Sequence, residues 1–153
     1  MERIDFVWTD GKNEEFQRFY IKTEEYYSKI VGGSEKRKGF VPFNLSESIS
    51  DVLLAYIDGA AAGCAGLKKY SDNDVEIKRV WVEPDHRGKQ IATKMMDRIE
   101  EKARMMNFRR AILQTRPIMT DAVGLYERRG YKLIENYPPY DKLDGAICMA
   151  LSL

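Results

Sequence analysis

One stretch of the chain, residues 76–96 (EIKRVWVEPDHRGKQIATKMM), passes from a strand pattern to a helix pattern within a few residues. Its first part alternates as a strand does, and Pro84 ends that strand because proline has no N–H to donate. A short polar turn follows at residues 85–89, and apolar residues then recur at helical spacing from Ile91 onward. The fold must therefore place a strand, a basic glycine-containing turn and the start of a helix in direct succession.

Alternation predicts two faces for the strand at residues 75–82. One face would carry Val75, Ile77, Arg79 and Trp81, and the other Glu76, Lys78, Val80 and Val82. A carboxylate on a central strand is costly to bury unless it has a partner or a function. Glu76 is therefore expected either to take part in a reaction or to pair with a neighbouring base such as Lys78 or Arg79.

The turn and the start of the helix together predict a binding site for an anion. The first N–H groups of a helix lack internal acceptors, and the helix dipole favours negative charge there. Arg87 and Lys89 add positive charge to the same turn, although two charges in a turn are also common on a solvated surface. The pattern indicates an anion without identifying which one.

The composition argues against several classes of protein. Hydrophobic residues make up 44% and charged residues 32% of the 153 residues, which is typical of one globular domain. A net charge of +1 argues against a generic nucleic-acid-binding protein, and no apolar run is long enough to span a bilayer. The N-terminus lacks the apolar region of a signal peptide. We therefore expect a cytoplasmic protein with neither nucleic acid nor a membrane as its partner.

Cysteine and histidine give no indication of a metal site. Cys64 and Cys148 lie in apolar, strand-like runs, which predicts two reduced, buried thiols, with a disulfide or a catalytic cysteine as the alternative. His86, the single histidine, is expected to be a solvated loop residue. These residues cannot form a zinc cluster, and no metal is expected.

The remaining patterns predict a chain of mixed strands and helices. Strands are expected at residues 4–8, 52–57, 60–69, 111–115, 131–135 and 146–151, and helices at residues 14–31 and about 121–129. Asn13 suits a helix cap, and Asp58-Gly59 is a hairpin signal.

The first helix carries an aromatic stripe, which is expected to pack in the core. The alternative is that Tyr20, Tyr26 or Tyr27 lines a ligand pocket. Residues 34–48 are expected to form a loop or short helix, which could cover an acceptor site.

Two motifs resemble the signatures of the GNAT family of N-acetyltransferases. Residues 82–92 resemble its acetyl-CoA motif, Arg/Gln-x-x-Gly-x-Gly/Ala: Arg87 and Ala92 match, whereas Gln90 stands where the family usually has glycine. Residues 122–131 resemble the second signature, A-x-x-L-Y-x-x-x-G-F/Y. The order of the predicted elements agrees. The resemblance implies an α/β (α+β) GNAT fold in one domain over residues 1–153, with a mixed central sheet of about seven strands. That sheet would be splayed between strands 4 and 5 and flanked by about four helices.

The resemblance also implies acetyl-CoA as co-substrate. Its pantetheine arm would pair with the backbone of the fourth strand, at Val80, Trp81 and Val82. Its pyrophosphate would bind the amides of the turn and first helical residues, which are Arg87, Gly88, Lys89, Gln90, Ile91, Ala92 and Thr93. This placement coincides with the anion site predicted above.

In the family, a tyrosine at the position of Tyr126 often protonates the departing CoA thiolate; the alternative is a core tyrosine with a satisfied hydroxyl. Glu76 resembles the glutamate base of some members, with the ion pair as its alternative. The N–H of Val82 would polarise the thioester carbonyl. The implied reaction is direct attack by a primary amine in a ternary complex.

The acceptor is expected to be a small-molecule amine, with a protein or peptide amine as the alternative. A non-catalytic CoA-binding sensor or interaction module is a further alternative, which the departure at Gln90 keeps open. An edge strand near the C-terminus could pair with a second copy to form a homodimer.

Overall fold

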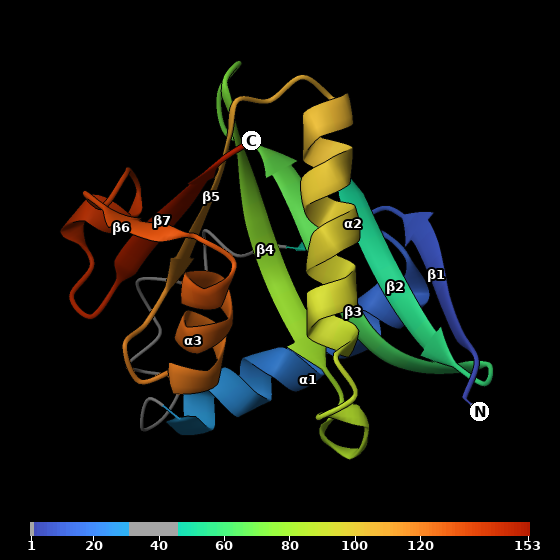
Figure 1. The fold of residues 1–153 in the computed structure, drawn as a ribbon. Coiled ribbons are helices and arrows are strands. Elements are labelled where there is room, and N and C mark those ends of the chain that lie inside the picture. Colours follow the sequence, from blue (N-terminus) through green and yellow to red (C-terminus); the bar gives the residue numbers. More distant parts are fainter. Residues whose placement is uncertain (1, 31–45) are drawn as a thin grey trace.

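The computed structural model describes residues 2–30 and 46–153. Its sheet has seven strands in the order β1-β2-β3-β4-β5-β7-β6 (Figure 1). The strands are β1 (Ile4–Thr9), β2 (Asp51–Ile57), β3 (Ala60–Lys69), β4 (Asp74–Val82), β5 (Arg110–Thr115), β6 (Lys132–Ile134) and β7 (Ile147–Ser152). The pair β4 and β5 is parallel and every other pair is antiparallel, which confirms the mixed seven-stranded sheet.

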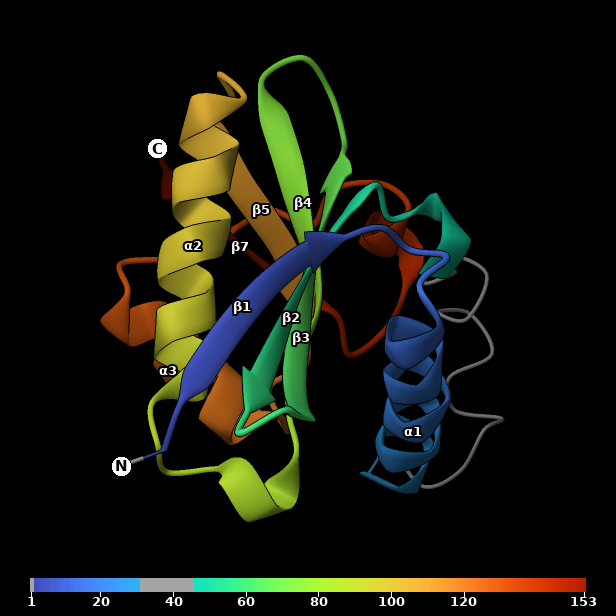
Figure 2. The ribbon, with the colours of Figure 1, turned by 90° about the vertical axis from the view of Figure 1, so that its right-hand side faces the viewer.

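The helices lie on both faces of this sheet. The described residues form three α-helices, α1 (Glu14–Ile30), α2 (Ile91–Met105) and α3 (Thr120–Arg128), and three short 3-10 helices, η3 (Ser46–Ser48), η4 (Pro84–His86) and η5 (Tyr140–Lys142). Helices α2 and α3 cover one face and α1 lies on the opposite face (Figures 1 and 2). Most of the segment expected to cover an acceptor, residues 34–48, lies outside the described residues.

Local chemistry explains how two of these elements begin and turn. The Oδ1 atom of Asn13 accepts a hydrogen bond from the N–H of Phe16 at 3.0 Å, which confirms the predicted cap of α1. Asp58 and Gly59 both have positive φ, 48° and 85°, as a two-residue hairpin between β2 and β3 requires. The cap and the turn could both be predicted from the sequence because each depends on neighbouring residues alone.

Three apolar clusters hold the layers together. The largest joins the sheet to α2 and α3, and a second lies between the sheet and α1, where Phe16 and Phe19 are buried. The third lies under the segment between β6 and β7, around the buried Tyr140. Cys64 and Cys148 are free and buried within the second and third clusters, as expected.

A β-bulge in β4 makes the predicted alternation wrong. The register with β3 shifts between Cys64 and Gly66, and Arg79 takes a left-handed conformation with φ 56°. The added residue of a bulge moves every later side chain to the other face of the sheet. Trp81 consequently packs toward α1, while Val80 and Val82 join Val75 and Ile77 on the α2 side.

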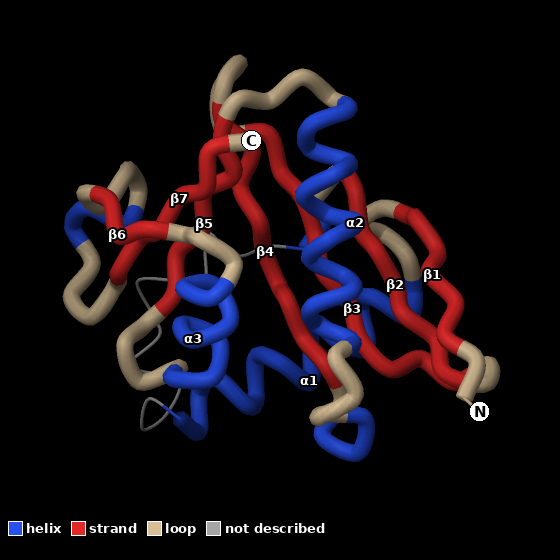
Figure 3. Tube along the Cα trace, viewed as in Figure 1, coloured by secondary structure: helices blue, strands red, loops and turns tan. Residues whose placement is uncertain are grey.

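Strands β4 and β5 pair over a short distance and then separate. Residues 74–76 of β4 pair with residues 110–112 of β5, and no later residue of either strand is paired with the other. The traces in Figure 3 diverge toward the ends that lie near α1 and α3. The sheet is therefore splayed between its fourth and fifth strands, as the family resemblance implied.

Candidate active site

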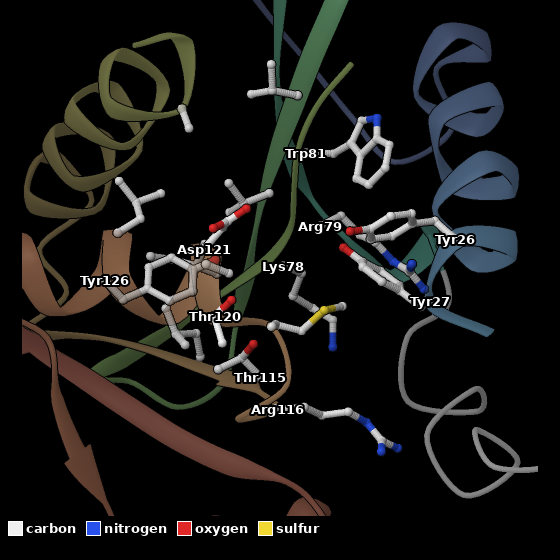
Figure 4. Close-up of a pocket in the computed structure, with 18 of the residues that line it drawn as sticks. Tyr26, Tyr27, Lys78, Arg79, Trp81, Thr115, Arg116, Thr120, Asp121 and Tyr126 are labelled. Carbon is white, nitrogen blue, oxygen red and sulfur yellow. The ribbon is translucent and has the colours of Figure 1, made fainter. Parts of the chain in front are cut away.

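The splayed strands form a cavity of about 590 Å³. Its walls come from the second half of β4, the end of β5, the turn before α2, the start of α3 and the last turn of α1. Figure 4 shows Tyr126 and Asp121 of α3 on one side and Tyr26 and Tyr27 of α1 on the other. The cavity is large enough for a small ligand or for one arm of a larger one.

The turn that begins α2 presents main-chain N–H groups. Gly88 has φ 83°, and Gln90, the residue that caps α2, is left-handed with φ 61° and ψ 24°. The first turn of α2 contains no acidic residue and no side chain caps it. The amides at residues 91–93 therefore remain available, which is what the predicted anion site requires.

Gln90 holds the backbone conformation that glycine adopts without strain. A residue with a side chain in the left-handed region costs about 1–2 kcal/mol, whereas glycine does not carry this penalty. Glutamine in place of the family's usual glycine therefore lowers the stability of the turn, but it leaves the N–H of residue 90 in place.

Both basic side chains of the turn contact other parts of the protein. The Nε of Arg87 donates to the carbonyl of Val82 at 3.0 Å, and its guanidinium lies 4.9 Å from the centre of the Trp81 ring. Lys89 pairs with Glu2 at 2.8 Å, and both partners are solvent-exposed. Exposed pairs of this kind contribute little stability, so either side chain can reorient toward a phosphate.

The second half of β4 directs main-chain groups into the gap. The N–H of Glu83 donates to the carbonyl of Ala62 in β3 at 2.8 Å. Backbone groups of an antiparallel strand alternate in direction, so the N–H and C=O of Val82 and Val80 point away from β3. They face the side from which β5 has separated, which is where an extended ligand could pair.

Tyr126 lines this cavity from α3 (Figure 4). Its side chain is 7% exposed, and within residues 2–30 and 46–153 its hydroxyl has no hydrogen-bond partner. Burial raises the pKa of the phenol, and the nearby Tyr27 hydroxyl adds to the increase. The hydroxyl therefore remains protonated at neutral pH and can donate a hydrogen bond to a ligand. The alternative of a core tyrosine predicted a hydrogen-bond partner for this hydroxyl, and the described residues do not provide one.

Glu76 belongs to a buried network of polar side chains. Its carboxylate accepts a hydrogen bond from the hydroxyl of Tyr137 at 2.8 Å and lies 3.5 Å from the Nζ of Lys78. Lys78 in turn donates to the hydroxyl of Tyr140 at 2.9 Å. Burial lowers the pKa of Lys78, and the charge of Glu76 opposes that shift. Glu76 thus has the ion-pair partner that the sequence suggested, and it also lines the cavity.

Arg79 connects the bulge of β4 to α1. Its guanidinium donates to the hydroxyl of Thr23 at 3.0 Å and pairs with Glu24. The ring of Tyr20 stacks on it at 4.5 Å. On the other side of the strand, the thiol of Cys64 donates to the carbonyl of Arg79 at 3.3 Å. Burial raises the pKa of this thiol, so Cys64 is unsuited to act as a nucleophile.

The structure brings nearly all the predicted site residues to one cavity. Eleven of the twelve line it, and the exception is Lys89. Six further residues have side chains in or beside the cavity, which are Lys78, Arg79, Arg116, Asp121, Tyr137 and Tyr140. The sequence indicated Lys78 and Arg79 only as possible ion-pair partners of Glu76, and the loop that contains Tyr137 and Tyr140 only as a possible wall of an acceptor pocket. No pattern pointed to Arg116 or Asp121.

The described residues contain neither a cluster of metal ligands nor a membrane-spanning helix. Among residues 2–30 and 46–153, no three His, Cys, Asp or Glu side chains gather closely enough to hold a metal ion. None of the helices in those residues is both long enough and apolar enough to cross a bilayer.

Comparison with known proteins adds independent information. The model of the acetyltransferase (GNAT) family matches residues 7–131. A curated relative named "Probable N-acetyltransferase camello", from Xenopus tropicalis, is 36% identical over 113 residues. That match covers 69% of this chain but only 52% of the relative, so the chain spans about half of that protein's length.

Solved structures of low identity share the fold. A GNAT-family acetyltransferase from Staphylococcus aureus superposes with a TM-score of 0.75 at 18% identity, covering 99% of each chain. A GNAT-family acetyltransferase from Elizabethkingia anophelis, crystallised with acetyl-CoA bound, gives a TM-score of 0.69 at 16% identity and covers 98% of each chain.

Proposed function

Because the chain belongs to the acetyltransferase (GNAT) family, we propose that it transfers the acetyl group of acetyl-CoA to a primary amine of a small molecule. The observation that carries this proposal is the gap between β4 and β5. It begins at the glycine turn, passes along backbone of β4 that is not paired with β5, and is lined by Tyr126. These are the features needed to hold a phosphate, an extended amide-containing arm and a leaving thiolate.

The residues of the turn fit the cofactor. The amides from Arg87 to Thr93 would hold the pyrophosphate, and the backbone of Val80 and Val82 would pair with the pantetheine arm. Trp81 would shape this wall through its ring, which packs toward α1. Acetyl-CoA supplies an activated acetyl thioester, and the protein supplies position and proton transfer.

The reaction needs three functions from the protein: stabilisation of the oxyanion, an acid for the leaving thiolate and a base for the amine. The amine nitrogen attacks the thioester carbonyl, a C–N bond forms and the C–S bond breaks. The N–H of Val82 would stabilise the negative charge that develops on the carbonyl oxygen. Tyr126 donates its proton, or a strong hydrogen bond, to the sulfur as the thiolate leaves.

The amine must lose a proton, and we propose Glu76 as the base that receives it. Glu76 lines the cavity and lies on β4 at the last residue that pairs with β5. Its hydrogen bonds favour a second role, in which it anchors Tyr137 and Lys78 and a water chain removes the proton instead. The pH dependence of a Glu76→Gln variant separates these roles.

Acetyl-CoA binding and turnover can be tested on the intact chain. A ligand at 100 times its Kd stabilises the native state by about 2.7 kcal/mol, so acetyl-CoA should raise the Tm by several degrees. A panel of amines and peptides should then release free thiol from acetyl-CoA, with small amines the better substrates. Unchanged Tm at millimolar acetyl-CoA would exclude a cofactor site. A Tm shift without thiol release would favour the CoA-binding sensor, and faster turnover with peptides would favour a protein acceptor.

A further inference from the structure

The part of the cavity that faces α1 is lined by three basic side chains. Lys78 and Arg79 come from β4, and Arg116 follows the end of β5. In Figure 4, Lys78 and Arg116 extend toward the same end of the cavity, away from Asp121. Two carboxylates lie beside them: Glu76, which lines the cavity next to Lys78, and Glu24 of α1, which pairs with Arg79. Arginine keeps its charge at every pH at which the protein is folded, so this end of the cavity contains permanent positive charge.

The fold leaves room for Arg116 at this position. Gly145, in the segment before β7, has φ 82°, and a Cβ atom added there would lie 3.3 Å from a guanidinium nitrogen of Arg116. A larger residue at position 145 would be strained and would press on this side chain. The planar fork of a guanidinium matches a carboxylate in a bidentate geometry, which a point charge cannot do.

The α1 tyrosines in and beside the cavity already contact arginine side chains. Arg79 lies 4.5 Å from the ring centre of Tyr20 and 5.5 Å from that of Tyr27. Arg87 lies 5.8 Å from the ring centre of Tyr26. These rings would be the attractive surfaces for a polycationic acceptor. Because the protein's own arginines contact them, a second cation would meet like charge there.

We propose that the acceptor is a primary amine that also carries a carboxylate, such as an amino acid, and that Arg116 binds this carboxylate. Lys78 and the hydroxyl of Tyr140 lie on the same side of the cavity and add donors to it. When the acceptor is held through its carboxylate, its amine remains free to attack the thioester. The same positive charge lowers the pKa of the acceptor's ammonium and so favours the neutral, nucleophilic amine. This inference rests on the transferase function proposed above.

A competition experiment tests the acceptor class. The protein, saturated with acetyl-CoA, receives an equimolar mixture of amino acids and their carboxamides, for example phenylalanine with phenylalaninamide and alanine with alaninamide. Mass spectrometry of the N-acetyl products gives the ratio of kcat/KM values for each pair. We expect the acids to be preferred at least tenfold. A ratio near one, a preference for the amides, or no acetylated acid at all would overturn the inference.

Variants assign the preference to Arg116. Arg116→Gln should reduce the acid-to-amide ratio to within about threefold of one, and Arg116→Lys should retain part of it. Arg109→Gln, an exposed arginine just before β5 at the opposite end of the strand, should keep the wild-type ratio. An Arg116→Gln variant with the wild-type ratio would overturn the role of Arg116.

The Tm shift with acetyl-CoA, measured on the same samples, separates this inference from the proposed function. If acetyl-CoA raises the Tm of every variant but the amides are the preferred substrates, only the proposal of a carboxylate-bearing acceptor is overturned. If acetyl-CoA does not raise the Tm of the wild-type protein, both proposals are overturned.

Discussion

At the α2 end of the cleft, the groups that would meet the cofactor are main-chain amides, from Gly88 to Thr93, and the two basic side chains nearby make only weak contacts. At the α1 end, the wall consists of side chains that bind one another: Glu76 with Tyr137 and Lys78, and Arg79 with Glu24.

The two ends of the cleft should therefore differ in how sensitive they are to substitution. We call the α2 end the main-chain half and the α1 end the side-chain half. A site built from amides should tolerate substitution, for instance at Gln90, because every residue type except proline offers the same N–H. A site built from paired, buried side chains is sensitive to every member, since removing one leaves the other buried and unpaired. The first arrangement suits a cofactor common to a family, and the second suits the acceptor particular to one member.

Tyr126 lies between the two halves and should give the largest effect. Tyr126→Phe should lower kcat by about 10²–10³-fold, because a positioned acid contributes that much, while acetyl-CoA affinity stays within about twofold. Steady-state kinetics and calorimetric titration provide both numbers. Tyr131→Phe is the matched control: that hydroxyl bonds to Glu100 at 3.0 Å, so its loss should affect stability and leave kcat near wild type. An unchanged kcat in Tyr126→Phe would return this tyrosine to a packing role.

Glu76→Gln tests the side-chain half. If Glu76 is the base, activity falls at low pH as the carboxylate gains a proton, and the variant should lose that limb of the kcat/KM profile. The buried Lys78 also loses its ionic partner, so the free energy of unfolding should fall by about 3 kcal/mol. A stopped-assay pH series and urea unfolding measure the two effects. The same low-pH limb in the variant would leave Glu76 as an anchor and point to a water chain.

Tyr137→Phe tests the same network through alkaline pH. Burial raises the pKa of Tyr137, and the charge of Glu76 raises it further. The native state then holds a proton that the unfolded chain releases above about pH 10, so stability is present below that pH and falls as pH rises. The wild type should lose up to about 1.4 kcal/mol more per pH unit above pH 10 than Tyr137→Phe. Equal slopes in urea unfolding between pH 9 and 11 would contradict this assignment.

Gln90→Gly tests the main-chain half and should give the smallest effect. Glycine removes the left-handed penalty but costs more backbone entropy, so the variant should gain about 0.5–1 kcal/mol of stability. Acetyl-CoA affinity should stay within about twofold because the N–H is unchanged. A tenfold gain in affinity would mean that the Gln90 side chain obstructs the phosphate site, and the contrast between the two halves would weaken.

Much of the cofactor half could be predicted from the sequence because its determinants are local. Pro84 ends the strand, Gly88 makes the turn, and the apolar period from Ile91 defines the helix, all within a few residues of one another. The hairpin at Asp58-Gly59 and the cap at Asn13 were predicted for the same reason.

The rest was decided by the tertiary structure. The bulge at Arg79 depends on how β4 meets β3 and α1, and it changed the face on which Trp81 lies. Tyr137, which donates to Glu76, lies 61 positions away along the chain, and no periodicity connects the two residues. The sequence by itself predicted the turn and the helix start at which we propose that a phosphate binds, because helix starts and turns follow from neighbouring residues. Only the packed sheet decided which charges meet in the acceptor cavity, because burial and pairing depend on contacts between distant segments.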